Sequence, residues 1–369
     1  MALTLHGTVT DNTVALDRRS AKPLVINGDM AVAQRSTSVT GITTAGFYTV
    51  DRIGTNLNGA GTWTQTQSTD TPTGSGFRTS LKMDCTTADA SPAAGDYLSM
   101  LYKFEGQEVQ LLKKGTSSAE GVSIAFWVKS AKTGTHILTL IDNDNNRAIS
   151  KTYTVSSANT WEKKVVYFAG DTTGVLDNDN ALSFYMLFYL VAGSNISSGT
   201  LQTSWDTLTT TDLAVGQVNL ADSTDNNWYL TGLQMEVGNF DANSIPPFQH
   251  ESYGDSLIRC QRYLWQEKND TGSTRYPTIG LAQGTGRGYG AWQINEMRTA
   301  PTVSVSDVGE FLPLNGAGAP KPVFTTVTNS LSTKNMVFLD LSGSSGLTSG
   351  QACPIGINDG HYVRGDAEL

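Results

Sequence analysis

Few side chains in this sequence have the spacing that enzyme chemistry requires. Its four histidines, His6, His136, His250 and His361, are spread over the whole chain. The sequence has no serine or cysteine in a GxSxG turn, no HExxH zinc motif and no Walker phosphate loop. A glycosidase acid pair stays open, because the required separation of two carboxylates is spatial. We expect a protein that is not an enzyme and has no catalytic residues.

Two short segments have compositions that suggest ligand binding. GTGRGYG, residues 284–290, is glycine-rich, but no helical pattern and no Lys-Ser/Thr pair follows it, which favours a hairpin tip over a phosphate loop. DNDNN, residues 142–146, resembles part of a calcium loop. It lacks the glycine at the sixth position and the closing glutamate, so a solvated turn is favoured. We therefore expect no cofactor, with a structural calcium ion as the open alternative.

Three tryptophans, Trp63, Trp205 and Trp228, are the candidate binding residues. The C–H face of a pyranose ring matches the plane of an indole, so exposed tryptophans could stack on glycans. The alternative is that all three belong to the core, which is the commoner place for tryptophan in a β-sandwich.

The elements that would position these residues are short strands. In GVSIAFWVKS the alternation places Val122, Ile124, Phe126 and Val128 on one buried face, and the apolar run Leu182–Ala192 predicts a buried strand. Similar runs recur between turns rich in Gly, Asn and Asp up to about residue 248. This pattern predicts an all-β fold with an antiparallel sandwich.

One segment, YGDSLIRCQRYLWQEK at residues 253–268, has apolar residues at spacings of three and four, which predicts a helix of about four turns. After it, GLAQGTGRGYGAWQINEM at residues 280–297 predicts a hairpin, and HYVRGDAEL at the end predicts an edge strand. The RGD within that stretch, Arg364 to Asp366, is read as a chance tripeptide. Within the sandwich region, SIAFWVKSAKTGTHILTLID and ANTWEKKVVYFAGDTTG resemble the jelly roll of carbohydrate-binding modules, which implies a jelly-roll fold there. The expected domains are an N-terminal attachment arm (1–22), this jelly-roll domain resembling a carbohydrate-binding module (23–250), a bridging helix (251–270) and a small C-terminal β module (271–369).

Composition excludes several classes of function. The formal net charge is −9, and Lys and Arg form no cluster, so we expect no nucleic-acid partner. No apolar run is long enough to span a bilayer, so we expect no membrane insertion. The N-terminal residues lack the pattern of a secretory signal. Cys85, Cys260 and Cys353 are too few and too scattered for a disulfide framework, and we expect them to be buried thiols.

Two further stretches resemble a known family. LVINGDMAVAQRSTSVTG with FYTVDRI resembles the opening of a domain found in tail-fibre and virion-surface proteins of tailed bacteriophages, and LQMEVGNFDANSIPPFQHESYGDSLIRCQRYLW resembles its close. The likeness runs over most of residues 23–369. Ile53 and Leu264 depart from the family's usual Trp and Tyr. Within the first motif we expect Asn27, Gly28 and Asp29 to form a tight turn in which the glycine takes a positive φ.

The resemblance implies a structural protein of the virion, made in the host cytoplasm, such as a tail fibre or other fibre-type adhesin that contacts host surface glycans. It also implies a homotrimer attached to other virion proteins through the N-terminal arm. Two alternatives stay open: a head-decoration or connector protein with no ligand, and a glycan depolymerase.

Overall fold

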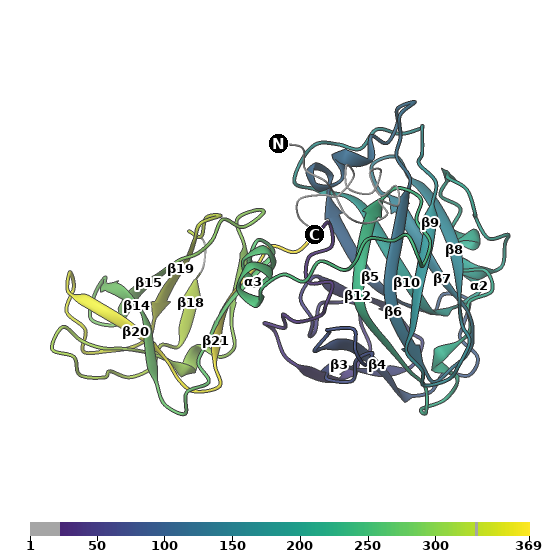
Figure 1. Ribbon diagram of the computed structural model, residues 1–369. Coiled ribbons are helices and arrows are strands. Elements are labelled where there is room, and N and C mark those ends of the chain that lie inside the picture. The colour runs from purple at the N-terminus through teal and green to yellow at the C-terminus, as the bar shows by residue number, and fades with distance from the viewer. Residues whose placement is uncertain (1–22, 329–330) are drawn as a thin grey trace, which may run out of the picture. The chain divides into compact units, whose positions relative to one another are not determined.

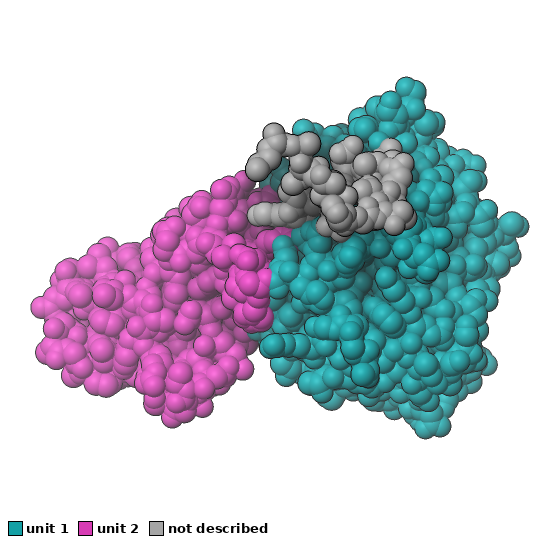
Figure 2. Space-filling view, in the orientation of Figure 1, with its two compact units in different colours: residues 1–251 teal, residues 252–369 magenta. Residues whose placement is uncertain are grey.

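The computed structural model describes residues 23–328 and 331–369, so the predicted attachment arm and His6 lie outside the described residues. The chain divides into two compact units, residues 1–251 and 252–369, coloured separately in Figure 2. Each unit is almost entirely β-structure, as the sequence predicted.

Unit 1 is an antiparallel sandwich of two six-stranded sheets (Figure 1). Sheet A has, in spatial order, β1 (Ser38–Ile42), β3 (Thr62–Ser68), β4 (Ser80–Thr87), β12 (Asn227–Val237), β6 (Val122–Ser130) and β9 (Glu162–Phe168). Sheet B has β11 (Asp206–Thr207), β8 (Arg147–Val155), β7 (Gly134–Asp142), β10 (Leu182–Ala192), β5 (Tyr97–Glu105) and β2 (Ile53–Asn58). The chain changes sheet between β4 and β5, between β5 and β6, and between β6 and β7, as expected for a jelly roll.

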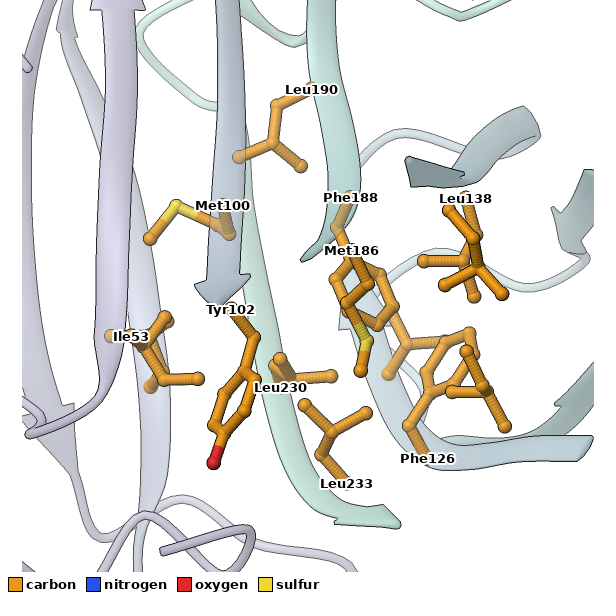
Figure 3. Close-up of a cluster of buried hydrophobic side chains, with 14 of the residues drawn as sticks. Ile53, Met100, Tyr102, Phe126, Leu138, Met186, Phe188, Leu190, Leu230 and Leu233 are labelled. Atoms are coloured by element: carbon orange, nitrogen blue, oxygen red, sulfur yellow. The ribbon is translucent and has the colours of Figure 1, made fainter. Parts of the chain in front are cut away.

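The core of unit 1 lies between the two sheets. The predicted inner face of β6 is confirmed, because Val122, Ile124, Phe126 and Val128 are all buried. The predicted strand at residues 182–192 is also confirmed as β10. Figure 3 shows Phe126 beside Phe188 of β10, with their ring centroids 5.0 Å apart. Burying such aromatic side chains supplies much of the driving force for folding.

The helical segments are short. Within the part of the chain that the structure describes, the α-helices are α2 (Ser194–Ser197) in unit 1 and α3 (Tyr253–Gln261) in unit 2. The described 3₁₀ turns are η1 (Gly106–Glu108), η2 (Gln110–Leu112), η3 (Thr210–Asp212), η4 (Leu220–Asp222) and η5 (Val308–Glu310).

Unit 2 contains two further antiparallel sheets around a core of its own. The smaller, sheet C, has the order β13 (Leu264–Lys268), β21 (Tyr362–Asp366) and β16 (Thr302–Val305). The larger, sheet D, has the order β17 (Phe311–Pro313), β20 (Ala352–Ile357), β14 (Arg275–Ala282), β15 (Arg287–Gln293), β19 (Met336–Ser342) and β18 (Thr326–Thr328). The predicted hairpin is confirmed as β14 and β15.

The predicted bridging helix at residues 251–270 is wrong in its second half. Ser252 caps α3 by accepting a hydrogen bond from the Asp255 N–H (3.2 Å), and the helix ends at Gln261. Residues 264–268 form strand β13 instead, paired along its whole length with β21. The local spacing of apolar residues is helical, but pairing with a strand about 100 residues away satisfies the backbone and buries Leu264 and Trp265.

The predicted edge strand at the end of the chain is also wrong in position. β21 lies at the centre of sheet C, between β13 and β16. The RGD tripeptide is therefore part of a strand with neighbours on both sides, and Gly365 pairs with Trp265 and Val303.

Candidate functional site

The two outer faces of the sandwich differ. On sheet B, the segment that contains α2 and η3 covers the outer face, where Ile196, Leu213 and Ala214 join a second apolar cluster with Ile137 and Leu187. On sheet A, the outer face carries polar and aromatic side chains, among them Trp127 and Lys129 of β6. A groove of about 360 Å³ lies on this face of sheet A.

We call this hollow the β6–β12 groove. Its lining residues come from β6, β9, β12 and two loops, and they include aromatic, polar and basic side chains but no carboxylate. They are Ser75, Phe77, Ala125, Trp127, Lys163, Gly232, Gln234, Pro247, Phe248 and His250.

Strand register and a β-bulge build the floor of the groove. Trp127 lies opposite Lys163 of β9 and opposite Thr231 of β12. The register of β12 against β6 shifts between Thr231 and Gln234, and Gly232 within this bulge has φ +62°. A Cβ there would lie 2.5 Å from the Phe77 ring and 3.1 Å from Trp127, so only glycine fits.

Three rings form one wall of the groove. Phe77 and Phe248 meet edge to face with centroids 4.9 Å apart, and the His250 ring lies 5.0 Å from Phe77 and 4.9 Å from Phe248. Aromatic side chains packed on one another lose little further entropy on binding, which favours ligand stacking. Trp127 and these rings therefore line the groove as a pre-formed apolar surface.

The motifs that carry the family resemblance lie behind this wall. The Gly28 carbonyl accepts a hydrogen bond from the Leu233 N–H (2.8 Å) in the β12 bulge. Gly28 does not take a positive φ, contrary to our prediction; Asn27 and Met30 do, at 60° and 61°. The glycine is required because a Cβ would lie 2.1 Å from the Leu233 carbonyl oxygen and 3.3 Å from the Phe248 ring.

The polar groups at the groove are few. Gln234 donates its side-chain N–H to the Pro246 carbonyl (2.9 Å), which fixes the amide at the floor. Lys163 and His250 are exposed. Asp29 is close enough to His250 to interact with its charge; burial raises the pKa of the Asp29 carboxyl, and the Ala31 N–H and His250 only partly oppose this.

A second row of side chains continues across sheet A. The Lys129 ammonium lies 4.3 Å from the centroid of the Tyr229 ring and 5.6 Å from that of Trp161. Asp70 forms an ion pair with Lys129 and accepts a hydrogen bond from the Trp161 indole (2.9 Å). Burial raises the pKa of Asp70, but these two hydrogen bonds outweigh it and hold the pKa below its usual value.

The predicted binding tryptophans do not come together at the groove. Trp63 and Trp228 are both 0% exposed, so their indoles have no face that a glycan could reach. Trp205 is half-buried; its indole donates to the Ala169 carbonyl (2.8 Å), and the Lys114 ammonium lies 5.1 Å from the centroid of its ring. The core alternative therefore holds for Trp63 and Trp228, because both side chains fill the space between the sheets.

The lining residues Phe77, Trp127, Lys163, Phe248 and His250 were not singled out from the sequence as binding residues. For Trp127 a signal was present. Because the alternation of β6 buries Phe126 and Val128, the tryptophan between them has to point outward. The other four depend on strand register and loop packing.

The DNDNN turn holds a cation from the protein itself. Asp142 is fully buried, so the predicted solvated turn is wrong at this residue. The Lys114 ammonium forms ion pairs with Asp142 and Asp171 and donates to the carbonyls of Thr173 (2.8 Å) and Gly174 (3.1 Å). Burial raises the pKa of Asp171, but hydrogen bonds from Arg147 and Lys114 hold it below its usual value.

Over residues 23–328 and 331–369, three or more His, Cys, Asp or Glu side chains nowhere gather in a way that could hold a metal ion. No helix in these ranges is long and apolar enough to cross a membrane. The three cysteines are buried, as predicted.

No protein-family model matches this chain, and no curated protein matches it in sequence. Among solved structures, it is similar to the enzymatically active domain of tailspike protein 4 of bacteriophage CBA120 (12% identity, TM-score 0.29), over 58% of this chain and 21% of that one. It is also similar to the family 11 carbohydrate-binding module of a cellulosomal cellulase of Clostridium thermocellum (11% identity, TM-score 0.28), over 58% of this chain and 94% of that one. The strand order of the two sheets in unit 1 defines its fold.

Proposed function

We propose that this chain is a non-enzymatic, glycan-binding structural protein of the bacteriophage particle surface, and that the β6–β12 groove is its binding site. One observation carries the site: Trp127 and the Phe77, Phe248 and His250 rings line a single groove on the outer face of sheet A. Flat apolar rings beside a few polar groups suit the C–H faces and hydroxyls of sugars.

One further observation supports binding rather than hydrolysis. Glycosidases use a pair of carboxyl groups beside the scissile bond. The lining of the groove contains neither Asp nor Glu. The placement on a phage particle is supported by the resemblance of the segments around Gly28 and Leu233, which hold the wall of the groove in place.

Replacing Trp127 by alanine tests the proposal. We expect binding to host cells to fall about tenfold, which corresponds to about 1.4 kcal/mol. The melting temperature should change little, because the indole lies on the outer face of the sheet. Trp205→Ala is the matched control, and its cell binding should equal that of the wild type.

Three results would contradict parts of the proposal. Unchanged cell binding of Trp127→Ala would remove the groove as the site. Release of reducing sugar ends from host polysaccharide by the purified protein would make it a depolymerase. Absence of any cell binding, with particles still infectious after the protein is stripped, would make it a head-decoration or connector protein.

A further inference from the structure

The β6–β12 groove differs in charge from the chain as a whole. The sequence has 34 acidic residues against 25 Lys and Arg, a formal net charge of −9. The groove reverses this balance, because its lining includes Lys163 and His250 and no carboxylate. The Asp29 carboxyl interacts with His250 but is not part of the lining, so the side of the groove that carries Lys163 is the part suited to an anion.

Among the described residues, Lys163 is a cation of the groove that has no partner within the protein. The neighbouring lysines are engaged: Lys82 with Asp84, Lys129 with Asp70, and Lys164 with Glu162. Within the described residues, the exposed Lys163 side chain has no ion pair or hydrogen bond. Its register opposite Trp127 places the two side chains as cross-strand neighbours, so a sugar stacked on the indole would lie within reach of the ammonium.

His250 supplies a second polar group at the ring wall. Contacts with Phe77 and Phe248 hold its ring. Within the described residues, neither of its ring nitrogens has a hydrogen-bond partner. An imidazole N–H can donate to a hydroxyl or to a carboxylate oxygen.

We propose that the ligand of the groove is an anionic glycan, whose carboxylate or sulfate group pairs with Lys163 while its sugar ring stacks on Trp127. This inference rests on the proposed function and specifies its ligand class. The ion pair is solvent-exposed, so it selects among glycans more than it adds affinity, and salt weakens it.

Affinity electrophoresis of the full chain through gels that contain a polysaccharide tests the inference. Polygalacturonate and its carboxyl-reduced neutral form make one pair of probes, and dextran sulfate and dextran make a second pair that distinguishes carboxylate from sulfate. We expect the wild type to bind the anionic member of at least one pair more tightly than the neutral member. Lys163→Gln should lose about threefold in affinity for that anionic polymer at low salt and nothing for the neutral one.

Lys151→Gln is the matched control. It removes the same charge from unit 1, at a lysine of β8 in sheet B that donates to the Thr203 carbonyl. Equal mobility of the Lys163 and Lys151 variants, or equal wild-type affinity for anionic and neutral polymers, would overturn the anionic preference. Glycan binding itself is judged separately by Trp127→Ala on host cells. Loss of cell binding in that variant, together with no preference among the polymers, would leave the proposed function standing and the ligand class wrong.

Discussion

At the scale of single residues, unit 1 contains a cluster of buried charges around Lys114. Lys114 sits among oxygen atoms of Asp142, Asp171, Thr173 and Gly174, a set of ligands that would also suit a hard cation. Here the ammonium neutralises the carboxylates. A structural calcium ion at this turn would have to compete with a covalently attached cation.

Lys114→Met should therefore be strongly destabilising. It leaves the Asp142 carboxylate buried without its cation, and breaking a buried ion pair on one side costs about 3–5 kcal/mol. The adjacent Lys113→Met is the control, because Lys113 pairs with Glu120 near the surface (3.1 Å) and should lose less than about 1 kcal/mol. Urea denaturation measures both. A Lys114 variant as stable as the control would show that the ion pairs of Lys114 contribute nothing to the free energy of unfolding.

Thermal denaturation addresses calcium. A bound ion that favours the native state has to raise its stability. Because Lys114 already neutralises the turn, we expect the wild type to melt at the same temperature in calcium and in chelator. A higher melting temperature in calcium than in chelator would instead reveal an ion site.

His136 makes stability depend on pH. Its side chain is fully buried, stacks on Tyr153, and its Nε2 has no partner among the described residues. Burial lowers the pKa of His136 to about 4, so the unfolded chain, with a histidine pKa near 6.5, binds the proton more readily. The contribution of His136 is complete above pH 6.5 and is lost as the pH falls toward 4. At pH 4.5 the loss is about 2.5 kcal/mol.

Comparing the wild type with His136→Gln by urea denaturation at pH 7 and pH 4.5 checks this. Carboxylates titrate in both proteins, so the histidine is reported by the difference between the two proteins in how much the free energy of unfolding falls from pH 7 to pH 4.5. An equal fall in both proteins would exclude His136 as an acid-sensitive residue.

At the scale of elements, the strands could be predicted from the sequence better than the helix at residues 251–270 or the groove. The inner face of β6 and the extent of β10 followed from alternation and from an apolar run, both local properties. The second half of the predicted helix failed because β13 is held by β21, a partner that local spacing does not indicate. The groove could not be predicted because its aromatic wall comes from residues 77, 248 and 250, which only the fold brings together.

The contact of the Gly28 turn with the β12 bulge should be critical for sheet A. A methyl group at Gly28 meets the Leu233 backbone, which cannot move without disturbing the ladder. We expect Gly28→Ala to lose about 2–3 kcal/mol. Gly95→Ala is the control, since its Cβ would meet nothing closer than 3.8 Å. Thermal melts that do not separate the two variants would contradict this role of Gly28.

At the scale of the whole molecule, the resemblance to fibre-type phage proteins predicts a homotrimer. Weak binding at each groove would then be multiplied by three linked copies. Light scattering of the full chain should give three times the mass of one chain at micromolar concentration. A stable monomer there would contradict the trimer. It would also require tight binding at a single groove.

The position of β12 has a consequence for synthesis on the ribosome. This strand lies between β4 and β6 at the centre of sheet A, yet it is the last strand of unit 1 to be translated. Until residue 237 has emerged, β1, β3 and β4 are separated from β6 and β9, and the apolar faces of all five stay incompletely covered. Unit 1 therefore closes late and in one step, and nascent chains that stall before Asn227 should be clients of chaperones.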